Sequence, residues 1–124
     1  MTQLLAIFIG GGLGSLARFG VGRLVVSQVK IDFPLGTLLA NILSCVVLGL
    51  AVGIFREKIA AEPWLRAFLV IGFCGGFSTF STFSYETQEL IRNQHHTFAI
   101  ANIAISILFC VLIIWWLSRQ PATA

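Results

Sequence analysis

Four long, mainly apolar stretches separated by short polar segments make up most of the chain. They cover residues 4–26, 35–55, 64–92 and 97–118. Each is close to the ~20 residues that an α-helix needs to cross a bilayer. The 124-residue length leaves room for four such helices and short loops. We therefore expect an all-α integral membrane protein, with residues 1–124 forming a single transmembrane domain.

The first stretch carries positive charge in its second half. Its uncharged part ends at Ala17, which is short for a crossing, so we expect the helix to continue with Arg18 and Arg23 snorkelling or facing water. Gly10 and Gly14 are small residues at four-residue spacing. Such spacing allows a second helix to approach closely in lipid.

The third stretch contains the most unusual segment, GFCGGFSTFSTFS at residues 72–84. Glycine weakens a helix, and five hydroxyl residues follow between Ser78 and Ser84. Irregular backbone at membrane depth persists only where it is buried in protein or lines a wet cavity. We therefore expect the third helix to be broken near its middle, around Gly75 and Gly76, and the functional site to lie there.

Polar residues also recur on single faces of the second and fourth helices. The helical period places Thr37, Asn41 and Ser44 on one face, and Asn102, Ser106 and Cys110 on another. Taken singly, each favours hydrogen bonding between helices. Together with the hydroxyl run they form a polar track on three of the four helices, which favours a pathway.

Phenylalanines alternate with the hydroxyl residues of the third helix. Phe77, Phe80 and Phe83 recur every third residue. Core packing is the usual role of such a stripe, but a ring edge carries partial positive charge. Edges turned into a narrow pore would attract a small anion, and hydroxyl donors would replace the water that it sheds.

Composition and charge exclude several classes of function. Residues are 57% hydrophobic and 10% charged, which is too apolar for a soluble domain. Four spans also use nearly all of the 124 residues, so there is no room for a soluble catalytic domain. The net charge of +3 is spread over helix ends and loops, which does not indicate a nucleic-acid partner. His95 and His96 lie in a loop, and the sequence shows no set of nucleophile, base and orienting residue. We therefore do not expect an enzyme.

The positive charges give the chain no preferred orientation. Four crossings place both termini on one side. The lysines and arginines on that side are Arg56, Lys58, Arg66 and Arg119, and those on the opposite side are Arg18, Arg23, Lys30 and Arg92. Four against four gives no direction by the positive-inside rule. Such a chain can insert both ways and pair as an antiparallel, dual-topology homodimer.

Three segments resemble a known family. Residues 72–84 closely resemble the helix-three signature of the Fluc (CrcB) family of fluoride channels, GGGLGSLARF at 10–19 resembles its first-helix motif, and GTLLAN at 36–41 resembles the start of its second helix. The resemblance implies dual-topology homodimers in the bilayer of a prokaryotic inner membrane. It also implies two antiparallel pores that export fluoride and lower its toxicity, and one central structural sodium ion (Na+).

The resemblance also assigns residues. The carbonyls of Gly75 and Ser78 would hold the sodium. The fluoride pore would involve Arg18, Thr37, Asn41, Phe80, Ser81, Thr82, Phe83 and Ser106. Where the family often has tyrosine and serine on helix four, this chain has Asn102 and Cys110. A thiol is a weak donor, so a fluoride contact at Cys110 is not predicted.

Two rival functions remain open. A small multidrug-type, proton-coupled transporter would need an intramembrane carboxylate, expected in helix one, where the only charges are positive. A non-transporting membrane structural subunit would explain the helices but not the interleaved hydroxyl and phenylalanine residues.

Overall fold

A computed structural model describes residues 1–121. This part of the chain forms helices joined by short loops and contains no strand. Four helical spans in this part of the chain are long and apolar enough to cross a membrane. They are α1 (Thr2–Gln28), α2 (Leu35–Ile54), the composite span Pro63–Arg92, and α7 (His96–Leu117). The four predicted spans are therefore confirmed, with bounds that differ by a few residues.

The third span is built from several pieces. It runs through α4 (Pro63–Arg66), the π-helical segment η1 (Ala67–Cys74), α5 (Gly75–Phe77) and α6 (Phe80–Arg92). Gly75 itself is helical, with φ −64° and ψ −35°. The two extended residues are Ser78 (φ −82°, ψ 158°) and Thr79 (φ −152°, ψ 122°). The irregular backbone thus begins two residues beyond the glycine pair, around which the break was expected.

The segment expected as the second loop contains a short helix, α3 (Arg56–Ala61). Its sequence, REKIAA, consists almost entirely of good helix formers. The Arg56 guanidinium donates from Nη2 to the Ser118 carbonyl oxygen over 2.8 Å, which ties α3 to the end of α7.

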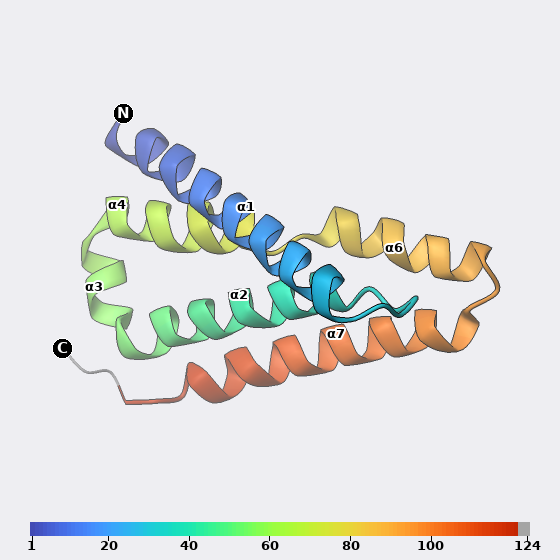
Figure 1. Cartoon of the computed structure of the whole chain (residues 1–124). Coiled ribbons are helices and arrows are strands. Elements are labelled where there is room, and N and C mark those ends of the chain that lie inside the picture. The colour runs from blue at the N-terminus through green and yellow to red at the C-terminus, as the bar shows by residue number, and fades with distance from the viewer. Residues whose placement is uncertain (122–124) are drawn as a thin grey trace.

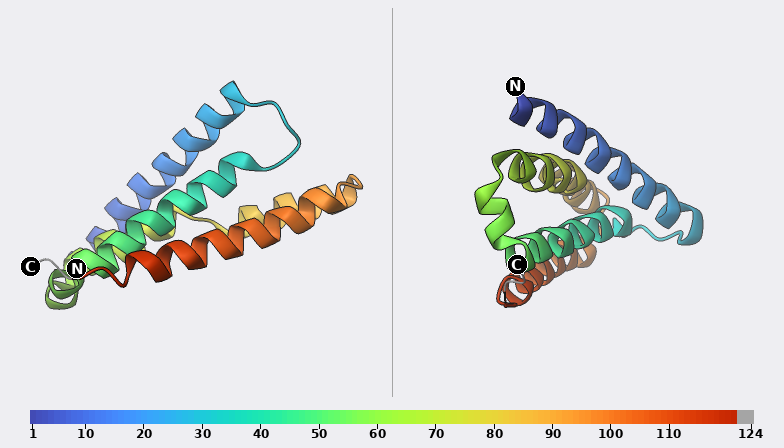
Figure 2. Two further views of the ribbon diagram at one scale, coloured as in Figure 1. Left: turned by 90° about the horizontal axis from the view of Figure 1, so that it is seen from below. Right: turned by 90° about the vertical axis from the view of Figure 1, so that its left-hand side faces the viewer.

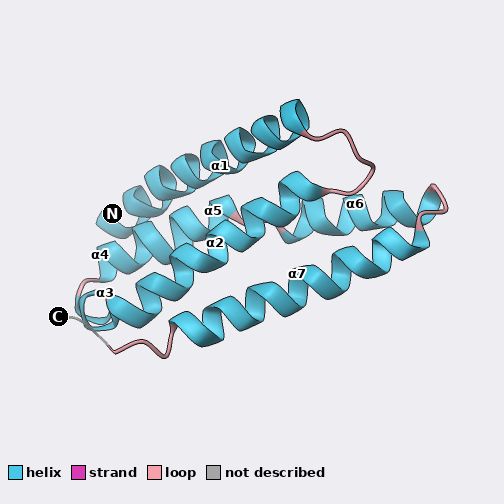
Figure 3. Cartoon of the chain, turned by 60° about the horizontal axis from the view of Figure 1, so that its bottom comes forward, coloured by secondary structure: helices cyan, strands magenta, loops and turns pink. Residues whose placement is uncertain are grey.

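Figure 1 shows that the N-terminus, α3 and the end of α7 lie at one end of the bundle, whereas the 29–34 and 93–95 connections lie at the other. The same elements lie at the same two ends when the molecule is turned, and α1 crosses the other helices obliquely (Figure 2). Loops are confined to the two ends and to the interruption between α5 and α6 (Figure 3). This places the interruption near the middle of the bundle.

Glycines allow α1 to cross the third span in close contact. A β-carbon at Gly10 or Gly14 would collide with the carbonyl oxygen of Phe68 or Phe73. On the facing segment, a β-carbon at Gly76 would lie 2.5 Å from the Gly11 carbonyl oxygen. The close approach predicted from the Gly10 and Gly14 spacing is therefore confirmed.

The second close helix pair is formed by α2 and α7. A β-carbon at Gly49 would lie 2.8 Å from the Leu117 β-carbon, and one at Gly53 would collide with the Leu117 carbonyl oxygen. Outside these contacts, much apolar surface stays exposed, including Phe8 on α1 and Trp116 on α7. Such a surface suits contact with lipid or with another protein chain.

Candidate functional site

Asn41 on α2 holds the interruption of the third span. Its Oδ1 accepts from the Thr79 backbone N–H over 2.8 Å, and its Nδ2 donates to the Thr79 carbonyl oxygen over 3.3 Å. Both backbone groups of an extended residue are thereby paired by one side chain. This is the requirement that a bilayer imposes on any non-helical backbone.

The Cys74 carbonyl oxygen, at the end of η1, accepts from three donors. They are the Ser44 hydroxyl at 2.9 Å, the Ser78 hydroxyl at 2.8 Å and the Ser78 backbone N–H at 3.0 Å. Ser44 is almost fully buried, at 3% exposure. Asn41 and Ser44, one turn apart on α2, therefore fix the two sides of the interruption.

Two backbone carbonyls lose the donors that a continuous helix would give them. In an α-helix the N–H of residue i bonds the carbonyl of residue i−4. The Thr79 N–H bonds Asn41 instead of Gly75, and the Thr82 N–H bonds the Thr79 hydroxyl, at 3.2 Å, instead of Ser78. The carbonyls so released, Gly75 and Ser78, are neutral oxygen ligands that suit a hard cation. Within residues 1–121 no cluster of three or more histidine, cysteine or carboxylate side chains could hold a metal instead.

A groove of about 270 Å³ lies beside the interruption. It is lined by Asn41, Cys45, Ser78, Thr79, Phe80, Phe83, Ser106, Ile107, Cys110 and Val111. The structure thus brings together the predicted Asn41, Phe80, Phe83 and Ser106. Cys110, for which no fluoride contact was predicted, also lines it.

The phenylalanines of the third span differ in environment. Phe80 is 79% exposed, whereas Phe83 is 9% exposed, and their ring centroids lie 5.7 Å apart with a tilt of 36°. Phe77 is buried and packs edge-on against Phe73 at 5.6 Å. Phe77 is therefore a packing residue, and only Phe80 and Phe83 line the groove.

Asn102 is not part of the groove lining, and it is buried, at 2% exposure. Its Nδ2 donates to the Thr87 hydroxyl over 3.0 Å, and Thr87 donates to the Phe83 carbonyl oxygen over 2.7 Å. Ser106 donates to Asn102 Oδ1 over 3.4 Å. This chain of bonds joins α7 to the Phe83 backbone on α6. The sequence did not single out Thr87, although it lies one helical turn after Phe83 and so on the same face.

A second cavity, of about 360 Å³, lies between α1, the start of α2 and the start of α6. Its lining includes Ser15, Arg18, Thr37, Thr79 and Thr82. Thr79 lines both this cavity and the groove, so the two adjoin. Ser81 is exposed beside them, its Oγ 3.3 Å from the Thr79 hydroxyl. The predicted Arg18, Thr37 and Thr82 thus share one cavity.

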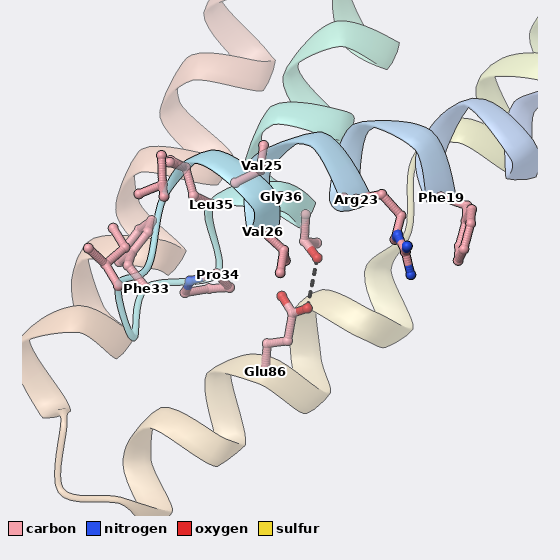
Figure 4. A pocket seen from close by; sticks show the side chains of 13 residues that line it. Phe19, Arg23, Val25, Val26, Phe33, Pro34, Leu35, Gly36 and Glu86 are labelled. Atoms are coloured by element: carbon pink, nitrogen blue, oxygen red, sulfur yellow. Dashed lines mark hydrogen bonds between the residues drawn. The ribbon is translucent and has the colours of Figure 1, made fainter.

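Glu86 on α6 is a residue that the sequence reasoning did not place in the site. Thr37 donates to Glu86 Oε1 over 2.8 Å, and Figure 4 shows the carboxylate reaching from α6 towards the start of α2. Glu86 Oε2 and Arg18 Nε are buried and have no hydrogen-bond partner. A carboxylate inside an apolar span was the signal that could have identified it.

The chain is similar to proteins of one family over nearly all of its length. Residues 5–117 match the family described as CrcB-like protein, Camphor Resistance (CrcB). A relative from Solibacter usitatus is 38% identical over 114 residues, covering 92% of this chain and 93% of the relative. One from Hydrogenovibrio crunogenus is 39% identical over 123 residues, covering 97% and 93% respectively. One from Pyrococcus horikoshii is 44% identical over 109 residues, covering 88% and 87%.

Each of these three relatives is named fluoride-specific ion channel FluC. The identities exceed 30% and the matched lengths are nearly complete on both sides, and the family model extends from α1 to the end of α7. This multi-pass membrane protein therefore belongs to the CrcB family.

Proposed function

We propose that this chain forms a passive, fluoride-selective ion channel and not an enzyme. The observation that carries the proposal is the groove where Phe80 and Phe83 meet Asn41 and Ser106 beside the interrupted span. The channel name of the three relatives supports it.

Fluoride is small and strongly hydrated, so a pore must replace its water with hydrogen-bond donors and still release it. Hydroxyls of Ser81 and Thr82 supply donors beside the cavity and the groove. Those of Thr37 and Ser106 donate to Glu86 and Asn102, so they would have to turn from these partners to meet the anion. Asn41 uses one N–H for the Thr79 carbonyl, which leaves its second N–H for the anion. The ring edges of Phe80 and Phe83 add a weakly positive surface that attracts without holding. Arg18 draws anions into the cavity.

The functional unit is an antiparallel, dual-topology homodimer with two pores. A Phe80 ring that is 79% exposed on one chain forms only part of a pore wall, and a second copy completes it. The equal charge count at the two ends permits both orientations. A two-fold axis through the interrupted spans relates the copies, since closed two-fold dimers are the commonest oligomers.

The released carbonyls of Gly75 and Ser78 would hold a structural sodium ion. The Gly75 and Ser78 carbonyls fit it, because their usual amide donors are bonded to Asn41 and Thr79 instead. Two carbonyls from each copy give four converging oxygens, which repel each other unless a cation lies between them. When bound, the ion would offset the mutual repulsion of the carbonyl oxygens at the dimer centre and would take no part in conduction.

In the plasma membrane of a prokaryote such a channel exports fluoride. HF enters from an acidic exterior, ionises in the cytoplasm, and the anion leaves down its gradient. An inside-negative potential contributes about 2.3 kcal/mol per 100 mV to this exit. The result is resistance to fluoride.

Efflux from liposomes tests the proposal. Purified protein is reconstituted into vesicles loaded with potassium fluoride or potassium chloride, and release is followed after addition of valinomycin. We expect rapid fluoride release, negligible chloride release, and no need for a proton gradient. Equal release of the two anions would overturn selectivity. Fluoride movement only with a proton gradient would favour a coupled transporter, in which Glu86 would be the candidate proton carrier.

A further inference from the structure

Two cysteines from different helices meet in the groove. Cys45 on α2 and Cys110 on α7 both line it, and their thiols are neighbours. Both are free and partly exposed. Cys45 lies one helical turn after Asn41, and Cys110 lies one turn after Ser106. The two thiols therefore form the next pair of facing side chains along the groove wall.

The packing of the two helices keeps this pair together. Gly49 and Gly53 follow Cys45 at four-residue steps and share its face, and Leu117 follows Cys110 by seven residues and shares its face. The glycines are in such close contact with Leu117 that a β-carbon would collide or lie 2.8 Å away. The helices therefore cannot separate easily next to the thiols.

We propose that Cys45 and Cys110 form a binding site for one soft, thiophilic divalent cation, and that its occupation closes the groove. The effect on conduction rests on the proposed channel function, whereas the binding site does not. Soft thiolate ligands select soft metal ions, for which two sulfur ligands can suffice. Carboxylate and imidazole ligands, which harder ions would need, are not part of the groove lining.

Charge balance favours a divalent soft ion in this environment. The thiolate is the metal ligand, so two thiols and one Hg2+ give one bis-thiolate complex and two released protons. Two S–H bonds break and two S–Hg bonds form, and no electron is transferred. The complex is neutral, which suits an apolar span where net charge is costly. A monovalent ion would leave one negative charge there.

The third cysteine provides an internal control. Cys74 lies on η1, is 4% exposed, is not part of the groove lining, and its thiol neighbours Ser44. Its replacement removes one thiol from the chain and leaves both groove thiols in place. A site made by two facing thiols excludes Cys74.

The first test measures binding without any flux. Full-length protein in detergent is titrated with HgCl2, and the ultraviolet absorption of the sulfur–mercury bond is followed. The thiols that remain reactive are counted, and the mass of the chain is measured by mass spectrometry under denaturing conditions. We expect one mercury per chain and the loss of two reactive thiols. Cys45→Ser and Cys110→Ser should each weaken binding by about 100-fold or more, because losing a ligand exceeds the effect of an outer-shell partner. Cys74→Ser should bind as the natural chain does.

Cys45→Ala and Cys110→Ala, which add no new hydrogen bond, repeat the measurement if a serine variant elutes abnormally. Binding by either single variant as tight as that of the natural chain would overturn the site. So would two mercury ions per chain.

The second test measures fluoride efflux from liposomes with mercury present, each variant being normalised to its own mercury-free rate. We expect a block in the natural chain and in Cys74→Ser, reversed by dithiothreitol, and little block in Cys45→Ser or Cys110→Ser. Tight binding with unaltered flux would overturn closure of the groove. Absence of fluoride flux before mercury is added would instead count against the proposed function and leave the binding result standing.

Discussion

Asn41 takes the place of helical hydrogen bonds at Thr79. Its amide accepts the Thr79 N–H at 2.8 Å and donates to the Thr79 carbonyl oxygen at 3.3 Å, across a sequence separation of 38 residues. The third span can therefore leave the helix at membrane depth without unpaired backbone at this residue. The same pairing removes the donor that Gly75 would otherwise have, so one side chain both stabilises the interruption and exposes a carbonyl.

Replacing Asn41 with leucine should destabilise the protein strongly. The side-chain volume is nearly kept, but both backbone groups of Thr79 lose their partner, and each unsatisfied buried group costs about 1–3 kcal/mol. We expect a large fall in thermal unfolding temperature and loss of fluoride flux. Asn93→Leu, in the exposed 93–95 connection, is the matched control and should leave both unchanged. An Asn41→Leu protein with natural stability would show that Thr79 finds other partners.

Gly14 should tolerate no side chain, because a β-carbon there would collide with the Phe73 carbonyl oxygen. The obstacle is rigid backbone, so Gly14→Ala must separate α1 from the third span, at a cost of roughly 1–3 kcal/mol for overpacking. Gly20→Ala on the same helix meets no atom within 4 Å. It should stabilise the helix by about 0.5–1 kcal/mol, the usual gain over glycine. The yield of folded protein and its unfolding temperature are compared for the two variants. Equal values would contradict the close packing of α1 against the third span.

The spans could be predicted from the sequence because a membrane allows few alternatives to an apolar helix. The Gly10 and Gly14 contact could be predicted for a related reason, since close packing in lipid depends on small residues. The irregular backbone was placed too early. Gly76 packs against Gly11 as part of a helix, and the chain leaves the helix only where Asn41 reaches Thr79.

The partners of the site residues could not be predicted. Spacing placed Asn102 and Ser106 on one face of α7, but it could not show that Asn102 faces Thr87, 15 residues away, instead of the groove. Thr37 and Glu86 are 49 residues apart and meet only because α2 begins beside α6. Helical periodicity gives the face of each residue, whereas the neighbour of that face is a property of the tertiary structure.

The rings of Phe80 and Phe83 should act through their edges. Phe80→Ile and Phe83→Ile keep an apolar side chain but remove the positive ring edge. We expect fluoride efflux to fall by about tenfold, which corresponds to roughly 1.4 kcal/mol at the barrier. Phe83→Ile should also cost up to about 1.5 kcal/mol of stability, because Phe83 is buried. Phe8→Ile is the matched control, since Phe8 is as exposed as Phe80, at 79%, and lies outside the groove. Unaltered efflux in both groove variants would make the rings packing residues.

The orientation of the chain should be mixed and adjustable. A membrane-impermeant maleimide applied to intact cells should label about half of the chains carrying Thr2→Cys, as a two-fold antiparallel dimer requires. Permeabilising the cells should label the rest. Adding Asn93→Lys and His96→Lys puts new positive charge at the other end of the bundle, which favours that end in the cytoplasm. External labelling should then rise. Labelling of all chains or none from outside, before the lysines are added, would contradict dual topology.

Sodium should stabilise the dimer through backbone oxygens. The Gly75 and Ser78 carbonyls are released because the Thr79 and Thr82 amides bond Asn41 and the Thr79 hydroxyl. An ion bound only to the folded dimer, at 100 times its dissociation constant, adds about 2.7 kcal/mol of stability. Exchange of sodium for N-methylglucamine should therefore lower the unfolding temperature and release monomers, and sodium should reverse both.

Ser78→Ala distinguishes backbone ligands from side-chain ligands. The Ser78 hydroxyl donates to the Cys74 carbonyl oxygen, which keeps the Ser78 N–H and the Ser44 hydroxyl when that bond is lost. The variant should lose only about 1 kcal/mol, the worth of one hydrogen bond. It should retain the full dependence on sodium, since its carbonyl is unchanged. A variant whose stability no longer responds to sodium would mean that the hydroxyl is the ligand. A natural chain equally stable with and without sodium would mean that the released carbonyls bind no ion.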